Sequence, residues 1–211
     1  MRQIIIGGFV CMAIVTVWQL VPVDWMPWRH GVLKVISEQQ QVTEVLKPRT
    51  GRPGVYIFPS PPPPLNARPT PEQFDAYQQA LAEYLATRRN GPVGMLFYHP
   101  AGIDTNLASR IQNAMAANML TALAAGVILW MSLGVAKRYW QRVVVVVMLS
   151  VFGGLAAYGP AFIWQDFPLE FILALGWDLV LSWLLAGLVL AAIIRPEPQP
   201  AEEPVEEDVD A

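Results

Sequence analysis

Four long apolar runs constrain this chain more than any other feature of its sequence. Each holds about 20 mainly apolar residues, the length that an α-helix needs to cross the hydrocarbon core of a bilayer. The composition agrees, because 54% of the 211 residues are hydrophobic, only 15% are charged and the mean hydropathy is +0.37, unlike an ordinary soluble domain. We therefore predict an α-helical membrane protein with four transmembrane helices, within residues 1–23, 113–135, 143–163 and 169–194.

The first run admits two interpretations, a cleaved signal peptide or a retained membrane anchor. A small-x-small cleavage site is missing, and Trp18, Trp25 and Trp28 stand where an interfacial aromatic belt accompanies a span. A retained anchor is therefore favoured. Cys11 is the only cysteine and lacks the preceding leucine and small residue of a lipoprotein signal, so we expect neither lipidation nor an intramolecular disulfide.

Basic residues in the short loops predict the orientation in the membrane. Lysine and arginine are enriched in cytoplasmic loops, and the turn at 136–142 is basic whereas the loop after the third run has no base. Both termini are then predicted to be cytoplasmic, residues 24–112 to be extracytoplasmic, and the bacterial inner membrane to be the location. The bases that set this topology are Lys137, Arg138 and Arg142.

Residues 24–112 are predicted to form a small α+β extracytoplasmic domain. Apolar residues near helical spacing indicate an amphipathic helix over 31–46, and "GVYIF" and "PVGMLFYH" read as short strands. Between the strands, a helix is predicted from Pro71 to about Arg89. The order strand, helix, strand predicts parallel pairing of the strands through a right-handed crossover.

The helix after Thr70 carries the clearest local signal in the chain. Thr70 and Gln73 have the identities of a capping box, and Pro71 occupies the first helical position. Phe74, Tyr77 and Leu81 would lie on one apolar face, which we expect to be buried.

The flanking segments suggest how the domain is supported. About 80 residues with two short strands make only a small core, so the domain is expected to rest on the membrane or on a partner. The proline run "PSPPPP" is interpreted as a rigid spacer, with a ligand for an aromatic-lined groove as the alternative. Residues 195–211 hold seven acidic residues and predict a disordered cytoplasmic tail, which solvation alone explains although a basic partner is an alternative.

Several short motifs link the chain to a known layout. They are Trp25, Pro27 and Trp28 after the first span, the strand "GVYIFP", Gly91 and Pro92 before the next strand, and Asp178 with "LAGLVLA" in the last span. In these features the chain resembles a family of uncharacterised small bacterial inner-membrane proteins with one N-terminal span, an exported segment and three further spans. The resemblance implies the architecture and transfers no activity and no site residue.

No catalytic constellation is recognisable. His99 and Asp104 in "HPAGID" could form a pair, but a histidine beside proline at a strand end is more often a turn residue, and His30 is the only other histidine. G-x-S-x-G, H-E-x-x-H and phosphate-loop patterns do not occur. We therefore expect no enzyme activity, no cofactor, no metal and no nucleic-acid partner.

Small residues spaced by four predict close helix packing in the spans. Such spacing lets helix backbones approach one another, and it fits either a compact bundle or a homo-oligomer. The residues expected at these contacts are Ala117, Ala122, Gly126, Gly153 and Gly154.

Asp178 is the one acidic residue set deep in a predicted span. Three polar residues of the other spans, Thr16, Asn118 and Tyr158, lie at a similar depth and predict an intramembrane polar layer. We expect Asp178 to face the bundle, to bond Tyr158 or Asn118 with Thr16 nearby, and to be uncharged because no cation lies in the spans. Its role is then mainly structural.

Three classes of function are compatible with this chain. The first is a non-catalytic accessory, scaffold or assembly protein of the bacterial envelope, with membrane lipids and a protein partner in the membrane or periplasm. The second is a small transporter or proton-coupled protein that uses Asp178, although no second intramembrane carboxylate accompanies it. The third, a membrane enzyme acting on lipid, lacks a polar cluster. We favour the first.

The topology gives a first testable prediction. An alkaline phosphatase fused after Ala211 should be inactive, because this reporter needs export and the basic turn predicts a cytoplasmic C-terminus. The same reporter inserted within residues 24–112 should be active and serves as the control. Activity of the C-terminal fusion would refute the predicted orientation.

Overall fold

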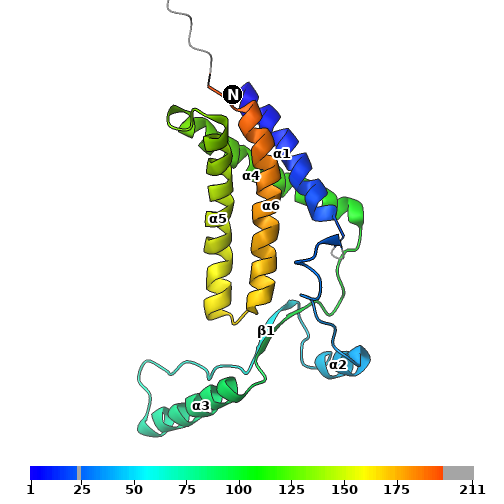
Figure 1. The fold of residues 1–211 in the computed structure, drawn as a ribbon. Helices are drawn as coiled ribbons and strands as arrows, with labels where there is room; N and C mark the ends of the chain where they lie inside the picture. The colour runs from blue at the N-terminus through cyan, green and yellow to red at the C-terminus, as the bar shows by residue number, and fades with distance from the viewer. Residues whose placement is uncertain (23–24, 197–211) are drawn as a thin grey trace, which may run out of the picture. The chain divides into compact units, whose positions relative to one another are not determined.

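The computed structural model describes residues 1–22 and 25–196 and confirms the predicted fold class, a mostly helical chain with four candidate membrane spans and a small sheet between the first two. Residues 23, 24 and 197–211, with nearly all of the expected acidic tail, lie outside the described residues. The spans, shown in Figure 1, are α1 (Arg2–Leu20), α4 (Leu107–Met131) extended by the 3-10 helix η2 (Ser132–Gly134), α5 (Tyr139–Trp164) and α6 (Leu169–Ile193).

The chain divides into two compact units. The first unit comprises Met1–Val32, Asn106–Gly159 and Leu169–Ala211, and the second comprises Leu33–Thr105 and Pro160–Pro168. Only 17% to 39% of the most apolar stretch of each span is buried, so most of these apolar side chains are available to lipid, as expected of membrane helices.

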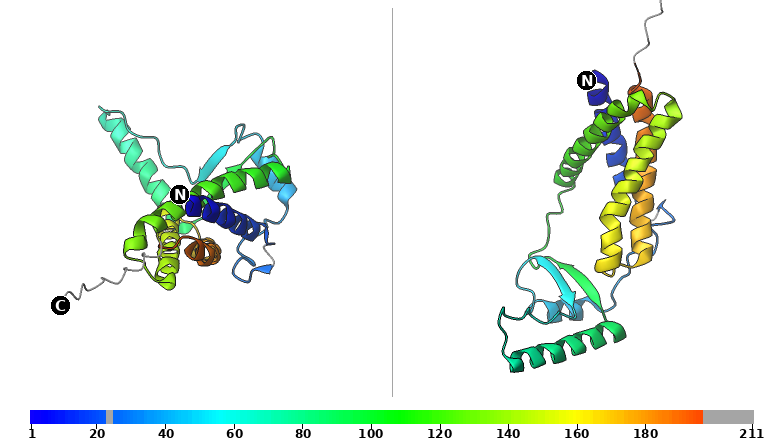
Figure 2. Two further views of the ribbon diagram at one scale, coloured as in Figure 1. Left: turned by 90° about the horizontal axis from the view of Figure 1, so that it is seen from above. Right: turned by 90° about the vertical axis from the view of Figure 1, so that its left-hand side faces the viewer.

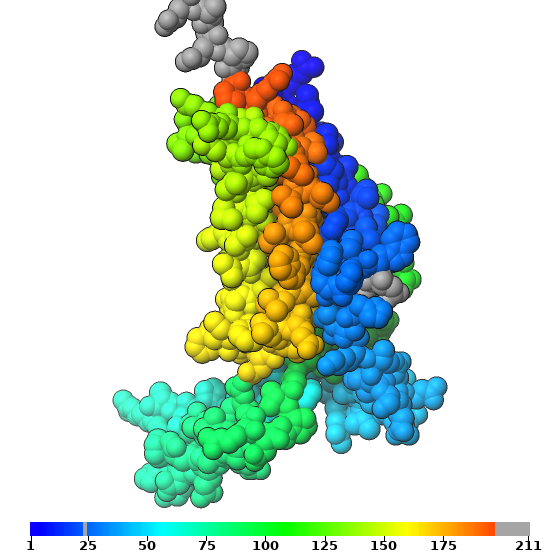
Figure 3. Space-filling view, viewed as in Figure 1, coloured from blue at the N-terminus to red at the C-terminus, as the bar shows by residue number. Residues whose placement is uncertain are grey.

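The first unit is a helical bundle in which α1 contacts both α4 and α6. Along one face, α6 lies between α5 and α1 (Figure 3), and α4 crosses α1 obliquely (Figure 2). The Cys11 thiol donates a hydrogen bond to the carbonyl oxygen of Ala186 at 3.3 Å, which joins α1 to α6. The largest fully buried side chains of the bundle are Leu129, Leu190, Ile194, Val146 and Cys11.

Small residues allow close helix contacts at some of the expected positions. Ala122 and Gly126 are buried on α4, and a Cβ added to Gly154 of α5 would lie 3.4 Å from Leu179. Ala117 is exposed, because it lies five residues before Ala122 and therefore about 140° around the helix. A Cβ on Gly153 would meet open space.

Close helix contacts are also found at glycines that the small-residue pattern did not single out. A Cβ added to Gly7 of α1 would lie 2.7 Å from Leu190, and one added to Gly187 of α6 would lie 3.1 Å from Val146. Since ordinary carbon contacts are longer, glycine at these positions lets α6 approach both α1 and α5.

The second unit contains a two-stranded sheet of β1 (Gly54–Phe58) and β2 (Gly94–Tyr98). The strands are antiparallel, with Gly54 opposite Tyr98 and Phe58 opposite Gly94, so the predicted parallel pairing is wrong. A parallel pair needs a crossover helix that covers the sheet. The helix between the strands, α3 (Pro71–Asn90), buries none of its residues and does not act as such a cover.

The helices of the second unit differ from the prediction in length and burial. The helix expected over 31–46 is reduced to α2 (Gln39–Leu46), because Glu38 at φ 55° and Gly31 at φ 70° adopt left-handed backbone conformations that a helix does not tolerate. On α3 the expected apolar face is not buried. Phe74 is 47% exposed, and Tyr77 and Leu81 are only half-buried.

The predicted cap of α3 is present. The backbone N–H of Gln73 donates to the Thr70 hydroxyl oxygen at 3.3 Å, and the backbone N–H of Thr70 donates to the Gln73 side-chain oxygen at 3.1 Å. The carboxyl of Glu72 accepts from its own backbone N–H and, as a smaller effect, bonds the Thr70 hydroxyl; both contacts lower the pKa of Glu72.

Removal of the cap should weaken α3 locally. We expect Thr70→Ala to cost about 1 kcal/mol of helix stability, because the N–H of Gln73 loses its acceptor. Hydrogen exchange of the amides of residues 74–85 in the membrane-bound protein measures this loss as faster exchange.

Thr87→Ala is the matched control on the same helix. The Thr87 hydroxyl bonds the Glu83 carbonyl oxygen inside the helix and caps no free N–H, so its loss should change exchange far less. Equal effects of the two substitutions, or unprotected amides in the unmodified chain, would contradict the capping role.

Candidate functional site

The carboxylate of Asp178 is held by two donors from the segment that follows α1. The indole Nε1 of Trp28 donates to Oδ1 at 2.8 Å, and Nε of Arg29 donates to Oδ2 at 2.6 Å. The side chains of Arg29 and Asp178 are 14% and 23% exposed. We call Trp28, Arg29 and Asp178 the clamp.

The clamp exists because the chain turns back after α1. Beyond the end of the helix, the backbone N–H of Trp25 donates to the Pro22 carbonyl oxygen and that of Arg29 to the Met26 carbonyl oxygen. The indole of Trp28 then stacks on Trp18 of α1, with ring centres 6.3 Å apart and planes 14° from parallel. This stacking, together with a second hydrogen bond of Arg29 described next, holds the segment after α1 in place.

Arg29 also binds the end of α1 directly. Its Nη1 donates to the carbonyl oxygen of Val21 at 3.0 Å, a group that the last turn of the helix leaves without an intrahelical partner. One guanidinium therefore satisfies both a helix end and the carboxylate of Asp178. Asp178 itself lies about 13 Å along α6 from Leu169, where that helix begins.

A polar cavity of about 330 Å³ adjoins the clamp inside the first unit. The Asn118 side-chain nitrogen donates to the Thr16 hydroxyl and to the Gln19 side-chain oxygen, each at 3.0 Å. The buried indole Nε1 of Trp18, another lining residue, has no hydrogen-bond partner among the described residues. The polar residues that line the cavity are Gln19, Arg29, Asn118, Thr121, Tyr158, Asp178 and Ser182.

The structure gathers the expected polar layer but gives Asp178 different partners. Asp178, Tyr158 and Asn118 line one cavity, and Thr16 bonds Asn118. The prediction that Asp178 bonds Tyr158 or Asn118 is wrong, because Trp28 and Arg29 occupy its two oxygens.

The expectation of an uncharged Asp178 assumed that no cation faces it, and Arg29 removes that assumption. An ionised carboxylate with a guanidinium and an indole N–H on its two oxygens is compensated in charge and in hydrogen bonding. In this geometry the clamp connects the segment after α1 to α6.

The three basic residues of the turn at 136–142 lie together at one end of the bundle. Lys137 and Arg138 are exposed, whereas Arg142 is buried. Arg142 donates from Nε to the Ala191 carbonyl oxygen at 3.0 Å and from Nη1 to the Lys137 carbonyl oxygen at 2.6 Å. Arg142 therefore also joins α5 to the last turns of α6.

Neither histidine belongs to the clamp or lines the cavity beside it. His30 and His99 are both exposed, and within residues 1–22 and 25–196 no group of three His, Cys, Asp or Glu side chains is placed to hold a metal ion.

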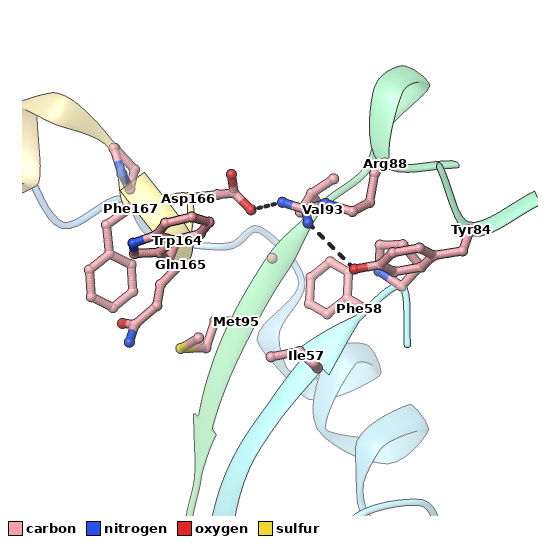
Figure 4. A pocket seen from close by; sticks show the side chains of 13 residues that line it. Ile57, Phe58, Tyr84, Arg88, Val93, Met95, Trp164, Gln165, Asp166 and Phe167 are labelled. Atoms are coloured by element: carbon pink, nitrogen blue, oxygen red, sulfur yellow. Dashed lines mark hydrogen bonds and ion pairs between the residues drawn. The ribbon is translucent and has the colours of Figure 1, made fainter. Parts of the chain in front are cut away.

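The second unit has a larger cavity, of about 520 Å³, with aromatic walls (Figure 4). Arg88 of α3 pairs with Asp166 and bonds the Tyr84 hydroxyl at 3.4 Å. The hydrogen bond to Tyr84, and next the charge of Asp166, raise the pKa of Arg88. Since the Arg88 and Asp166 side chains are 38% and 50% exposed, solvent screens their attraction and the pair stabilises the unit little. The ion pair of Arg29 and Asp178 beside the smaller cavity is less exposed than that of Arg88 and Asp166, so we take the smaller cavity as the candidate site.

Comparison with models of protein families, with curated proteins and with solved structures finds no match to this chain. The expected relation to a bacterial family therefore gains no support from them. The helices and their apolar faces define the class, a small multi-span membrane protein with a two-stranded unit between its first and second spans.

The clamp predicts strong coupling between Arg29 and Asp178. Arg29→Gln or Asp178→Asn alone should destabilise the bundle by about 2–4 kcal/mol, because each leaves a partly buried charge without its partner. The double variant should lose clearly less than the sum of the two, which a double-mutant cycle on thermal unfolding in detergent measures.

Arg138→Gln is the control, because it removes an exposed charge from the same unit and should change stability little. If the effects of Arg29→Gln and Asp178→Asn simply add, the two residues do not form a clamp in the protein.

Proposed function

We propose that the protein is a non-catalytic accessory or assembly protein of the bacterial envelope, anchored in the inner membrane and binding another protein through its second unit. The observation that carries this proposal is the weak core of that unit. Within residues 33–105 and 160–168, the only buried side chains are Ala161 and Thr50. A unit with so little buried apolar surface gains stability when a partner covers it.

The sheet offers a defined surface for such a partner. Paired residues of an antiparallel sheet share a face, and alternate residues along a strand do too. Val55 and Phe97 are paired and are 55% and 63% exposed, and Ile57 and Met95 are paired on the same face. A two-stranded sheet is marginally stable alone, and an exposed apolar face of this kind is typical of an interaction site.

The clamp supports the same function from the first unit. The second unit begins at Leu33, four residues after Arg29, so the clamp fixes the point where the chain leaves the bundle. The basic turn at 136–142 favours an extracytoplasmic location for the second unit and hence a periplasmic partner or the periplasmic part of a membrane protein.

Polar substitutions on the sheet face should release the partner. We expect Val55→Thr with Phe97→Thr to abolish a stoichiometric complex that the unmodified protein keeps in mild detergent, because threonine preserves the strand but removes apolar contact area. Molar mass after size-exclusion chromatography measures the complex. Val35→Thr with Ile36→Thr is the control, since both residues are exposed but lie outside the sheet.

A photo-crosslinking residue identifies the contact in cells. Placed at Phe97 it should give a protein adduct, and placed at Leu120, an exposed residue of α4, it should not give the same adduct. A chain that purifies alone and crosslinks only lipid from Phe97 would refute the proposed function.

A second candidate is a small transporter or proton-coupled protein that uses Asp178. The polar cavity beside Asp178, lined also by Tyr158 and Asn118, favours it. The double variant Arg29→Gln with Asp178→Asn separates the two functions. It removes both charges together, so no unpaired charge is left in the bundle, but residue 178 can no longer exchange a proton. A double variant that folds but no longer supports the cellular function would favour proton coupling; one that keeps the function would favour the structural role.

A further inference from the structure

We propose that the first unit binds the phosphate head group of an anionic phospholipid in a pocket at one end of the bundle. The pocket, here called the two-arginine pocket, measures about 720 Å³, within the usual range of ligand sites. Its lining residues include Arg2, Gln3, Trp130, Leu133, Arg195 and Pro196.

Three helices meet at this pocket. α1 begins at Arg2, α4 continues into η2 at Ser132, and α6 ends at Ile193; Figure 1 shows these ends at the same end of the bundle. The backbone N–H of Arg195 donates to the Gln3 side-chain oxygen at 3.3 Å, which holds the two termini of the bundle together. The ends of membrane spans lie at the level of lipid head groups.

The two arginines are available to a ligand. The ion pairs in the part of the chain that the structure describes use Arg29 and Arg88, not Arg2 or Arg195. The acidic residues of the described first unit are Glu170 and Asp178, and Asp178 lies about 25 Å from Arg195 along α6. Guanidinium groups bind phosphate strongly, since they donate several N–H groups in a planar fork.

The rest of the lining favours a lipid over a soluble anion. Trp130 and Leu133 give the pocket an apolar wall beside the two cations, and an amphiphile with a charged head and an acyl chain matches both. Basic pockets between membrane helices commonly bind anionic head groups. The acidic segment after Pro196 is the competing occupant, but the only apolar side chains it offers to the apolar wall are those of proline, alanine and two valines.

Native mass spectrometry of the full chain, with added dioleoyl phosphatidylglycerol or phosphatidylethanolamine, tests the proposal. We expect selective retention of phosphatidylglycerol. Arg2→Gln with Arg195→Gln should lower its affinity about 30-fold, because both charge-assisted contacts with the phosphate are lost. Arg2→Lys with Arg195→Lys keeps both charges and should retain most of the binding, which separates lost binding from lost folding.

Lys137→Gln with Arg138→Gln is the matched control. It removes the same charge from the same end, but neither residue lines the pocket, so affinity should change by no more than about threefold because dispersed surface charge is screened. If the two glutamine variants lose phosphatidylglycerol affinity equally, the lipid is attracted by the overall surface charge and the proposed pocket is wrong.

Two further arms address the other ligands. Deletion of residues 197–211 should leave phosphatidylglycerol affinity nearly unchanged, and an increase of tenfold or more would show that the acidic segment occupies the pocket instead. Millimolar inorganic phosphate should not displace the lipid. Displacement would identify a soluble phosphate as the ligand and overturn the lipid assignment.

Discussion

The hydrocarbon core of a bilayer offers no hydrogen-bond partners, and this constraint explains the polar contacts of the spans. Four hydroxyls meet it locally, because each donates to a backbone carbonyl three or four residues earlier in the chain: Thr121 to Ala117, Ser132 to Leu129, Ser150 to Val147 and Ser182 to Leu179. These contacts fix no tertiary arrangement. Polar groups too large to be satisfied within one turn must find partners on another segment.

Several such groups link the helices of the first unit, among them the Tyr139 hydroxyl, which donates to the Leu188 carbonyl oxygen at 3.0 Å. Asn118 joins α4 to α1 through Thr16 and Gln19, and Arg142 joins α5 to α6 through the Ala191 carbonyl. The clamp joins α6 to the segment after α1. Since lipid gives apolar surfaces little reason to prefer one helix over another, contacts of this kind and the close approach at glycine specify the bundle.

The amino-acid sequence alone predicted those features that depend on residues close together in the chain. The spans follow from runs of apolar residues, and the α3 cap follows from Thr70, Pro71 and Gln73 within four positions. The partner of Asp178 could not be found in this way, because Arg29 is one of nine lysine and arginine residues between 24 and 112 and only the fold of the intervening turn brings it to α6. The prediction of parallel strands was wrong for a related reason, because the pairing direction depends on whether α3 packs over the sheet.

The two units satisfy their apolar surfaces in different ways. Exposed side chains of the spans, such as Leu120 and Phe152, find lipid, and their exposure costs nothing in a membrane. Val55 and Phe97 of the sheet are exposed to a similar degree, but neither residue lies on a candidate spanning helix. Each Å² of those side chains left in water forgoes about 25 cal/mol of the stabilisation that burial would give. A similar fraction of exposed apolar surface therefore fits a membrane in the first unit, and in the second unit it is the basis on which we propose a protein partner.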